Sequence, residues 1–358
     1  MHGVKRSRVP AVADSVEVER KKREKQLEQI KQYTTLVQDL QQRMKGEDYS
    51  QETLRLTTKV LSLNPEFHTG WSMRRTILLK SLLKDHDDAA SGSSSRQEVL
   101  QGDLDLTNQS LKLNPKNYSV WEHRKWVLET MPDADWKFEI KMVELYLEKD
   151  GRNFHSWDYR RYLIDSILNL SNDPQRLALR SKPLPEPLPT TETELGFTKK
   201  KISENFSNFS AWHYRTKLLS KLWEERGWQS EQHEERQKRV DQEFELVKQA
   251  IWSDPNDQSA WLYHRWLVGT GSISLVKREI EGIEELLEEE PDSRWCLDSL
   301  VHYKRLLVSL LGSAEETREE REKLNLECKG MLDRLVEIDP MRANRYRDIG
   351  LQIVPGMR

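Results

Sequence analysis

Apolar residues recur at three- and four-residue spacing along most of the chain, and short polar turns interrupt them. Segments 54–63, 106–113 and 244–251 have the spacing of amphipathic helices. Each is followed by Asn or Asp and then Pro, which lacks the N–H that a continuing helix needs. A second amphipathic stretch then begins near a Trp. The pattern predicts pairs of helices joined by tight turns.

The tryptophans mark an internal repeat. Six of the 12 occupy one position shortly after a turn, and an Asn, Asp or Glu lies seven residues earlier. A weaker last copy has Tyr346 in that position, seven residues after Asp339. Short spacings of 36 and 34 residues between successive copies predict a unit of about 35 residues with insertions. The six are Trp71, Trp121, Trp157, Trp212, Trp261 and Trp295, preceded by Asn64, Asn114, Asp150, Asn205, Asp254 and Glu288.

A basic residue follows most of these tryptophans by three positions, on the same helix face. These are Arg74, Arg124, Arg160 and Arg215, whereas the fifth copy has His264 there and Arg265 next. We expect a structural role, in which each Arg stacks on a neighbouring Trp or bonds to carbonyl groups, rather than contact with substrate.

A lone helical hairpin cannot bury a Trp, but stacked hairpins can, and each buried indole contributes about 2–3 kcal/mol. The predicted fold is therefore all-α, a right-handed α-α superhelix (solenoid) of helical hairpins. We expect a mobile basic tail at 1–13, a charged lead-in helix at 14–48 and six to seven hairpins over 49–358. Inserts are expected at 84–98 (a Ser-rich flexible loop), 181–191 (Pro-rich, extended) and 224–242 (a solvated helix of mixed charge).

Composition narrows the class of protein. The chain has 57 Lys and Arg against 60 Asp and Glu, so its net charge of −3 argues against nucleic-acid binding. Charged residues make up 33% of the chain against 36% apolar, which suits an elongated helical protein. Cys296 and Cys328 form no paired motif, and no apolar run approaches the ~18 residues of a membrane span. Without a signal peptide or lipidation motif, we expect a soluble cytoplasmic protein.

Motifs for chemistry are sparse. The sequence has no Gly-rich phosphate loop, no nucleophile elbow and no Cys-x-x-Cys pair. Histidines near the tryptophans differ in their spacing from them, so we expect packed or turn histidines rather than metal ligands. From its residues alone, the chain looks like a scaffold that needs a partner.

The repeated unit, Asn/Asp-Pro followed by Trp-x-x-Arg, resembles the α-subunit repeat of protein prenyltransferases from about residue 50 to 350. Segments RNFHSWDYRR (152–161) and ENFSNFSAWHYR (204–215) are most similar to the type II branch, which modifies Rab proteins. The branch shared by farnesyltransferase and type I enzymes typically has Asn-Tyr where this chain has Asn153-Phe154.

The resemblance implies an obligate heterodimer. A β subunit would hold the catalytic zinc, the lipid pocket and the peptide site. The enzyme would transfer geranylgeranyl from geranylgeranyl diphosphate to C-terminal cysteines of Rab GTPases, which a Rab escort protein presents. The α chain could add positive charge where the departing diphosphate develops charge.

Two residues are candidates for such a site, Lys116 and Tyr118. Lys116 matches the family position whose Lys reaches the diphosphate, and a solvated turn lysine is the alternative. Tyr118 is a weaker candidate for the same diphosphate site. Phe154 lacks the hydroxyl of the Tyr that the farnesyltransferase and type I branch has at that position. His2, on the basic tail, is a candidate removable inhibitory ligand of the partner's zinc.

Two other functions stay open. One is the α subunit of farnesyltransferase or type I geranylgeranyltransferase. The other is a non-catalytic tetratricopeptide-like adaptor, which a period near 34 residues favours only in a general way.

Overall fold

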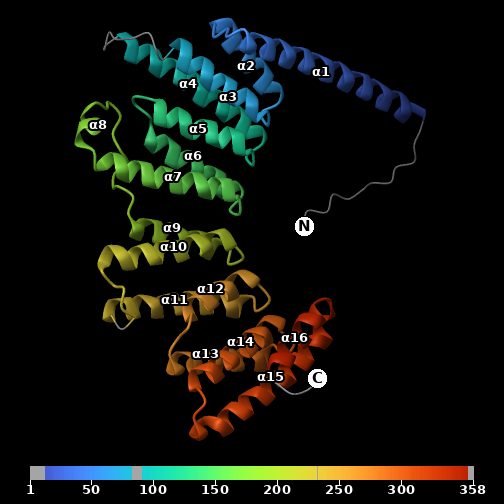
Figure 1. Ribbon diagram of the computed structural model, residues 1–358, viewed down its shortest axis with the longest axis vertical. Helices are drawn as coiled ribbons and strands as arrows, with labels where there is room; N and C mark the ends of the chain where they lie inside the picture. Colours follow the sequence, from blue (N-terminus) through green and yellow to red (C-terminus); the bar gives the residue numbers. More distant parts are fainter. Residues whose placement is uncertain (1–12, 83–90, 232, 354–358) are drawn as a thin grey trace. The chain divides into compact units, whose positions relative to one another are not determined.

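The structure, a computed structural model, describes residues 13–82, 91–231 and 233–353, and these residues form helices and connecting turns without a strand (Figure 1). The first helices are α1 (Ala13–Lys45), α2 (Gln51–Leu63), α3 (His68–Ile77) with a π-helical extension (Leu78–Leu82), α4 (Ser91–Leu113), α5 (Tyr118–Thr130), α6 (Trp136–Lys149), α7 (Phe154–Ser171) and α8 (Pro174–Ala178). The remainder are α9 (Thr191–Glu204), α10 (Phe209–Arg226), α11 (Glu234–Ser253), α12 (Gln258–Val268), α13 (Ile273–Glu289), α14 (Arg294–Leu311), α15 (Arg318–Ile338) and α16 (Ala343–Ile353).

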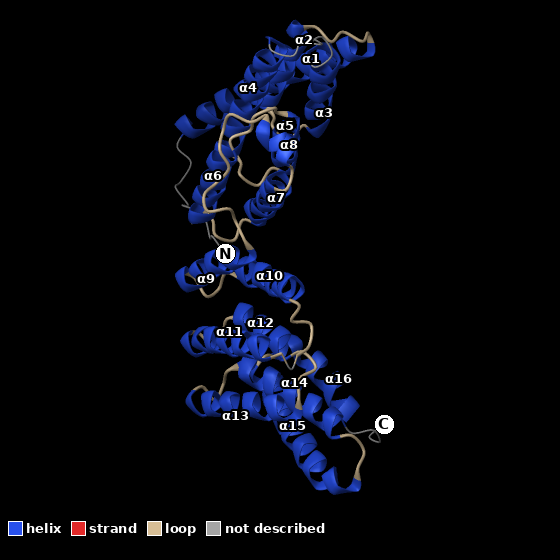
Figure 2. Cartoon of the chain, turned by 90° about the vertical axis from the view of Figure 1, so that its left-hand side faces the viewer, coloured by secondary structure: helices blue, strands red, loops and turns tan. Residues whose placement is uncertain are grey.

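The helices fall into two compact units. Unit 1 comprises the described residues up to Glu148 together with Asn153–Leu188, and unit 2 comprises Lys149–Arg152 and the described residues from Pro189 onward. In unit 1, α1 packs on α2, α2 pairs with α3, α4 pairs with α5, and α5 contacts both α3 and α7. In unit 2, α9 pairs with α10, α11 with α12, α13 with α14 and α15 with α16 (Figure 2). The predicted all-α class of helical-hairpin repeats is confirmed.

In four of the hairpins the Trp side chain closes the turn. The indole N–H of Trp121 donates to the carbonyl oxygen of Pro115 at 2.9 Å, six residues earlier. Trp71, Trp212 and Trp261 make the same bond to a turn carbonyl, at 2.8 to 2.9 Å. The side chain therefore fills the core and also satisfies a carbonyl that the preceding helix leaves unpaired. All four of these tryptophans, and Trp157, are buried as predicted.

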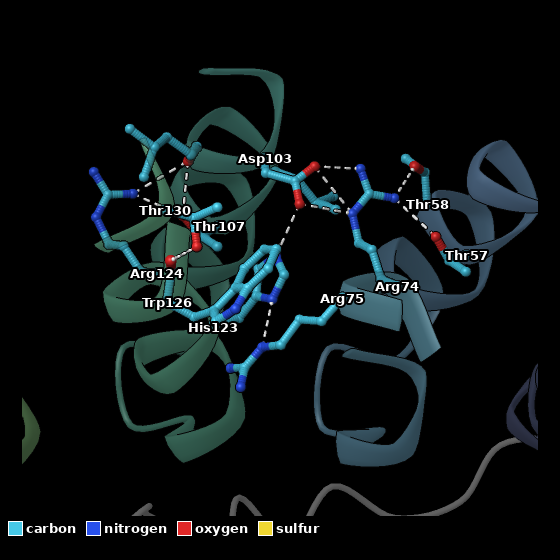
Figure 3. Close-up of polar contacts among 12 residues, drawn as sticks. Thr57, Thr58, Arg74, Arg75, Asp103, Thr107, His123, Arg124, Trp126 and Thr130 are labelled. Atoms are coloured by element: carbon cyan, nitrogen blue, oxygen red, sulfur yellow. Dashed lines mark hydrogen bonds and ion pairs between the residues drawn. The ribbon is translucent and has the colours of Figure 1, made fainter. Parts of the chain in front are cut away.

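The basic residue three positions after Trp joins one hairpin to the next. Arg74 on α3 binds both carboxylate oxygens of Asp103 on α4 and also bonds to Thr57 and Thr58 of its own hairpin (Figure 3). Arg124, Arg215 and His264 likewise bind Glu139, Glu243 and Glu279, each on the first helix of the following hairpin.

Of the two kinds of contact expected for these residues, bonds to carbonyl groups are present: Arg74, Arg124 and Arg215 donate to the carbonyls of Leu54, Leu104 and Leu195. The buried carboxylate partners were not predicted. A buried charge needs an opposite charge more than it needs a ring. Arg160 pairs at 3.0 Å with Glu144 of its own hairpin, 16 residues earlier, as Arg124 bonds to Asn108. Arg265 pairs at 2.7 Å with Asp298.

The register of the sixth hairpin also differs from the prediction. Trp295, expected in the buried Trp position, is partly exposed, and Leu297 is buried instead. Glu290 caps the C-terminal end of helix α13, and Pro291 follows it. Leu297 lies seven residues after Glu290, as Trp121 lies seven residues after Asn114. The Trp295 alignment is therefore two residues out of register. In the seventh hairpin Tyr346 is buried as predicted, and its hydroxyl donates to Asp339 at 2.7 Å.

The segments outside the hairpins follow the prediction in part. The lead-in helix is present as α1, and the Pro-rich segment is irregular until α9 begins. Residues 91–98, expected to be a loop, belong to α4. The rest of that insert, residues 84–90, lies outside the described residues. Within the described part of the chain, no helix combines the length and the apolar character that crossing a membrane requires.

Candidate functional site

The turn between α4 and α5 presents Lys116 at the surface. Its backbone N–H donates to the Oδ1 of Asn114 at 3.1 Å, which fixes the tight turn after α4. Asn117 then caps α5, with its Oδ1 accepting the N–H of Val120 at 3.3 Å. The Lys116 side chain is exposed on this turn. Local turn chemistry therefore fixes the backbone from which the Lys116 side chain extends.

The next hairpin brings an aromatic cluster to the same turn. The Tyr118 ring meets the His155 ring edge-on at 4.1 Å between centroids, and it lies 5.9 Å from the Phe154 ring. Although these residues begin α5 and α7, 36 or more positions apart in sequence, they lie side by side. Tyr118 and Phe154 are 65% and 54% exposed, which is high for large aromatic side chains. An exposed aromatic pair of this kind marks a contact surface.

A hydrogen bond holds the two turns together. The side-chain amide of Asn153, which caps α7, donates to the Pro115 carbonyl at 3.2 Å. The same carbonyl accepts the indole N–H of Trp121. Asn153 is buried, so this bond fixes the start of α7 next to the turn that carries Lys116.

The electrostatics of the cluster favour an anion. Burial lowers the pKa of His155 below its ordinary 6.5, and the positive charge of Lys116 lowers it further against the opposing effect of Asp158. His155 is therefore neutral near pH 7. The amine of Lys116 carries the charge, and the rings supply apolar surface, an arrangement suited to an anionic group attached to an apolar body.

The structure thus puts Lys116, Tyr118 and Phe154, the residues singled out from the sequence, in one place. His155 joins them, and sequence reasoning missed it because its spacing from Trp157 matches no other histidine. Its position directly after Phe154, at the start of a helix, was the available signal. His2 lies outside the described residues.

Of the other histidines near the tryptophans, His123 and His264 are packed, whereas His68 and His213 are exposed. The His123 Nε2 lies 2.9 Å from a carboxylate oxygen of Asp103, and Arg75 donates to its Nδ1 at 3.2 Å (Figure 3). His264 lies between Glu279 and Tyr303. In the described ranges, no three His, Cys, Asp or Glu side chains gather closely enough to hold a metal ion. Cys296 and Cys328 are free and buried.

Comparison with known families and proteins follows the repeat pattern. The model of the protein prenyltransferase alpha subunit repeat matches residues 50–81, 100–131, 136–167, 191–222 and 240–270. The first two matched segments lie in unit 1 and the last two in unit 2, while the third lies in unit 1 apart from Lys149–Arg152.

Relatives of similar length are geranylgeranyl transferase type-2 alpha subunits. The protein from Schizosaccharomyces pombe is 36% identical over 98% of this chain and 97% of its own length. The protein from Candida albicans is 29% identical over 97% of this chain and 96% of its own length. The relative from Sus scrofa is 35% identical over 75% of this chain, which corresponds to 42% of that longer protein.

A solved structure supports the same fold. The Candida albicans protein geranylgeranyltransferase-I complexed with GGPP has a chain that matches with a TM-score of 0.60 at 22% identity. The match covers 90% of this chain and 91% of that chain. The helical-hairpin architecture is therefore shared with that protein.

Proposed function

Since this chain belongs to the protein prenyltransferase alpha-subunit family, we propose that it is the α subunit of a type-2 geranylgeranyl transferase. The similarity to the Schizosaccharomyces pombe subunit, over nearly the full length of both chains, carries this conclusion. A non-catalytic tetratricopeptide-like adaptor does not account for a match of that extent. The relatives quoted above are type-2 subunits, which favours this branch over the farnesyl and type I branch.

The proposed enzyme is a heterodimer in which the β subunit supplies the zinc, the lipid pocket and the peptide site. A free cysteine thiol has a pKa of about 8.5, so a metal is needed to make it a thiolate at neutral pH. The proposed substrates are geranylgeranyl diphosphate and the C-terminal cysteines of Rab GTPases, presented by a Rab escort protein. The buried free thiols suit a reducing cytoplasmic location.

In this proposal, Lys116 stabilises the diphosphate as it leaves the isoprenoid. The carbon–oxygen bond to the diphosphate breaks while the thiolate attacks, so negative charge grows on the departing oxygen. An exposed amine on a turn fixed by hydrogen bonds can meet that charge without reorganising. Tyr118 and Phe154, steadied by His155, would line the same mouth against the partner.

Co-expression tests the function. We expect the chain alone to be inactive and prone to aggregate, and to give zinc-dependent transfer once a type-2 β subunit is present. Geranylgeranyl diphosphate with a Rab and its escort protein should react faster than farnesyl diphosphate with a single-cysteine tail. A stable monomer that binds none of the available β subunits would contradict the proposal.

Substitution of Lys116 tests the site separately. We expect Lys116→Ala to lower turnover by about 10²–10³-fold, the usual loss for one charge-stabilising donor, while heterodimer assembly is unchanged. Lys112→Ala is the matched control, since Lys112 is exposed in the last turn of α4, just before the same turn. Equal turnover in the two variants would return Lys116 to the role of a surface lysine.

A further inference from the structure

A polar cavity lies in unit 1 near the C-terminal ends of α5 and α7, the helices that begin at Tyr118 and Phe154. Its volume is about 330 Å³, within the range of small-molecule sites. The end of α5, the start of α6, the second half of α7 and the α8 region form its walls. Because α5 has 13 residues, its two ends lie about 18 Å apart.

One wall of this cavity is cationic. Arg180 is buried, and its Nη2 pairs with Asp133 at 3.3 Å and donates to the Ala134 carbonyl. These contacts hold the guanidinium in place but leave its buried Nε–H without an acceptor among the described residues. Arg176, which is exposed on α8, lies close enough that its charge lowers the pKa of Arg180, alongside the larger effect of burial.

The connection after α8 fixes this wall. Asp133 accepts hydrogen bonds from the Ser181 hydroxyl and from the Lys182 backbone N–H, in addition to pairing with Arg180. The carboxylate therefore ties the segment carrying Arg180 to the end of α5. The guanidinium is preorganised, so a ligand would not have to order it.

The remaining lining supplies further polar groups, among them Tyr162, Ser166 and Asn169, together with an apolar surface and one acid. The indole N–H of Trp136 is buried and has no acceptor among the described residues, although its ring lines the cavity. Leu128, Met131 and Leu170 contribute apolar contacts. Glu129 is exposed at the rim and opposes the arginines.

We propose that this cavity binds a small organic phosphate, with the phosphate against Arg176, Arg180 and Trp136 and a ring-sized apolar body against the aliphatic wall. A phosphate monoester has three acceptor oxygens and a charge near −2, so it can meet donors that come from three different segments. A carboxylate has two oxygens in one plane and a single charge.

Calorimetric titration of phenyl phosphate into the full chain tests the proposal, with the chain co-purified with a β partner if solubility requires it. For a ligand of this size, a dissociation constant of about 1 mM is expected. Inorganic phosphate, which lacks the ring, should bind at least about tenfold more weakly. Absence of saturable binding, or tighter binding of benzoate, would overturn the assignment.

Three variants locate the site. Arg176→Gln should weaken binding by about tenfold or more, since it removes a charged donor, and Trp136→Phe should weaken it severalfold while keeping an aromatic ring. Glu129→Gln should tighten binding severalfold because it removes the opposing charge. Arg226→Gln is the control, since it makes the same charge change at an exposed residue at the end of α10 in unit 2, and it should leave binding unchanged.

Circular dichroism of each variant checks that it folds. Arg176 and Glu129 are exposed, so their substitution should not disturb packing. Binding that is unaffected by both Arg176→Gln and Trp136→Phe would show that phenyl phosphate binds elsewhere and would overturn the proposal. The prenyl transfer assay is a separate readout, so failure here leaves the proposed function standing.

Discussion

Replacement of Arg124 by Met tests how neighbouring hairpins are held together. Arg124 is fully buried and binds Glu139 through two parallel N–H···O bonds, of 2.8 and 2.6 Å. Its other terminal nitrogen bonds to Thr107, Asn108 and the Leu104 carbonyl. Burial by itself would lower the pKa of Arg124, but the attraction of Glu139 outweighs it and keeps the group charged.

The cost of this change follows from what Arg124 leaves behind. Methionine fills much of the volume, so the loss of packing is small. Glu139, which is 1% exposed, would keep only the Tyr159 hydroxyl as a donor, at 2.6 Å. Breaking a buried ion pair on one side costs about 3–5 kcal/mol, because an uncompensated charge stays buried. Replacing both partners by apolar residues removes that charge.

Urea unfolding followed by circular dichroism measures the effect. We expect Arg124→Met to lower the free energy of unfolding by about 3–5 kcal/mol, and the double variant Arg124→Met/Glu139→Leu to recover most of that loss. Arg161→Met is the control, since the Arg161 side chain is 31% exposed and pairs at 3.1 Å with exposed Asp158, so it should cost about 0.5 kcal/mol. Equal losses for Arg124→Met and Arg161→Met, or a double variant as unstable as the sum of the singles, would refute the reasoning.

Three further changes probe the buried groups. Burial lowers the pKa of His123 below 6.5, so the unfolded chain takes up its proton first and stability should fall as the pH drops below about 6.5. In His123→Tyr, the difference in urea midpoint between pH 7.5 and 5.5 should shrink; an unchanged difference would assign it to other groups. Trp212→Phe removes a 2.8 Å hydrogen bond to a turn carbonyl and should cost about 1–2 kcal/mol in urea unfolding, whereas Trp252→Phe, at an exposed position, should cost far less. Burial raises the pKa of Cys328 to about 11, so a thiol reagent followed by mass spectrometry at pH 7 should label it only after denaturation; rapid labelling of the native chain would contradict its burial.

Much of the candidate site was visible in the sequence, because its parts lie in repeated local motifs. Asn114 and Pro115 predict the turn that carries Lys116, and the family resemblance singles out Lys116 and Tyr118. The contact between Tyr118 and His155 was not predictable, since it joins two hairpins. No local pattern specifies which ring of one turn meets which ring of the next.

The sequence by itself determined the hairpins. Helical spacing, helix-stopping Asn-Pro or Asp-Pro pairs and a Trp seven residues later are local signals, and local backbone chemistry is enough to interpret them. It did not determine the register of the sixth hairpin. That hairpin was aligned on Trp295, although Leu297 is the residue that lies seven positions after Glu290, which caps α13. There the position of the helix end, rather than the presence of a Trp, fixes which residue is buried.

Only the tertiary structure decided which acids pair with the buried arginines. The chain has 60 Asp and Glu, and Asp103, Glu139 and Glu243 each lie 18 residues before the Trp of their own hairpin. That spacing marks a repeat position, but it does not show that the acid faces the arginine of the preceding hairpin. Each is selected because packing the next hairpin removes it from water beside an arginine, where an unpaired charge would be costly. Local spacing therefore determines the hairpins, whereas desolvation between hairpins determines how they are joined.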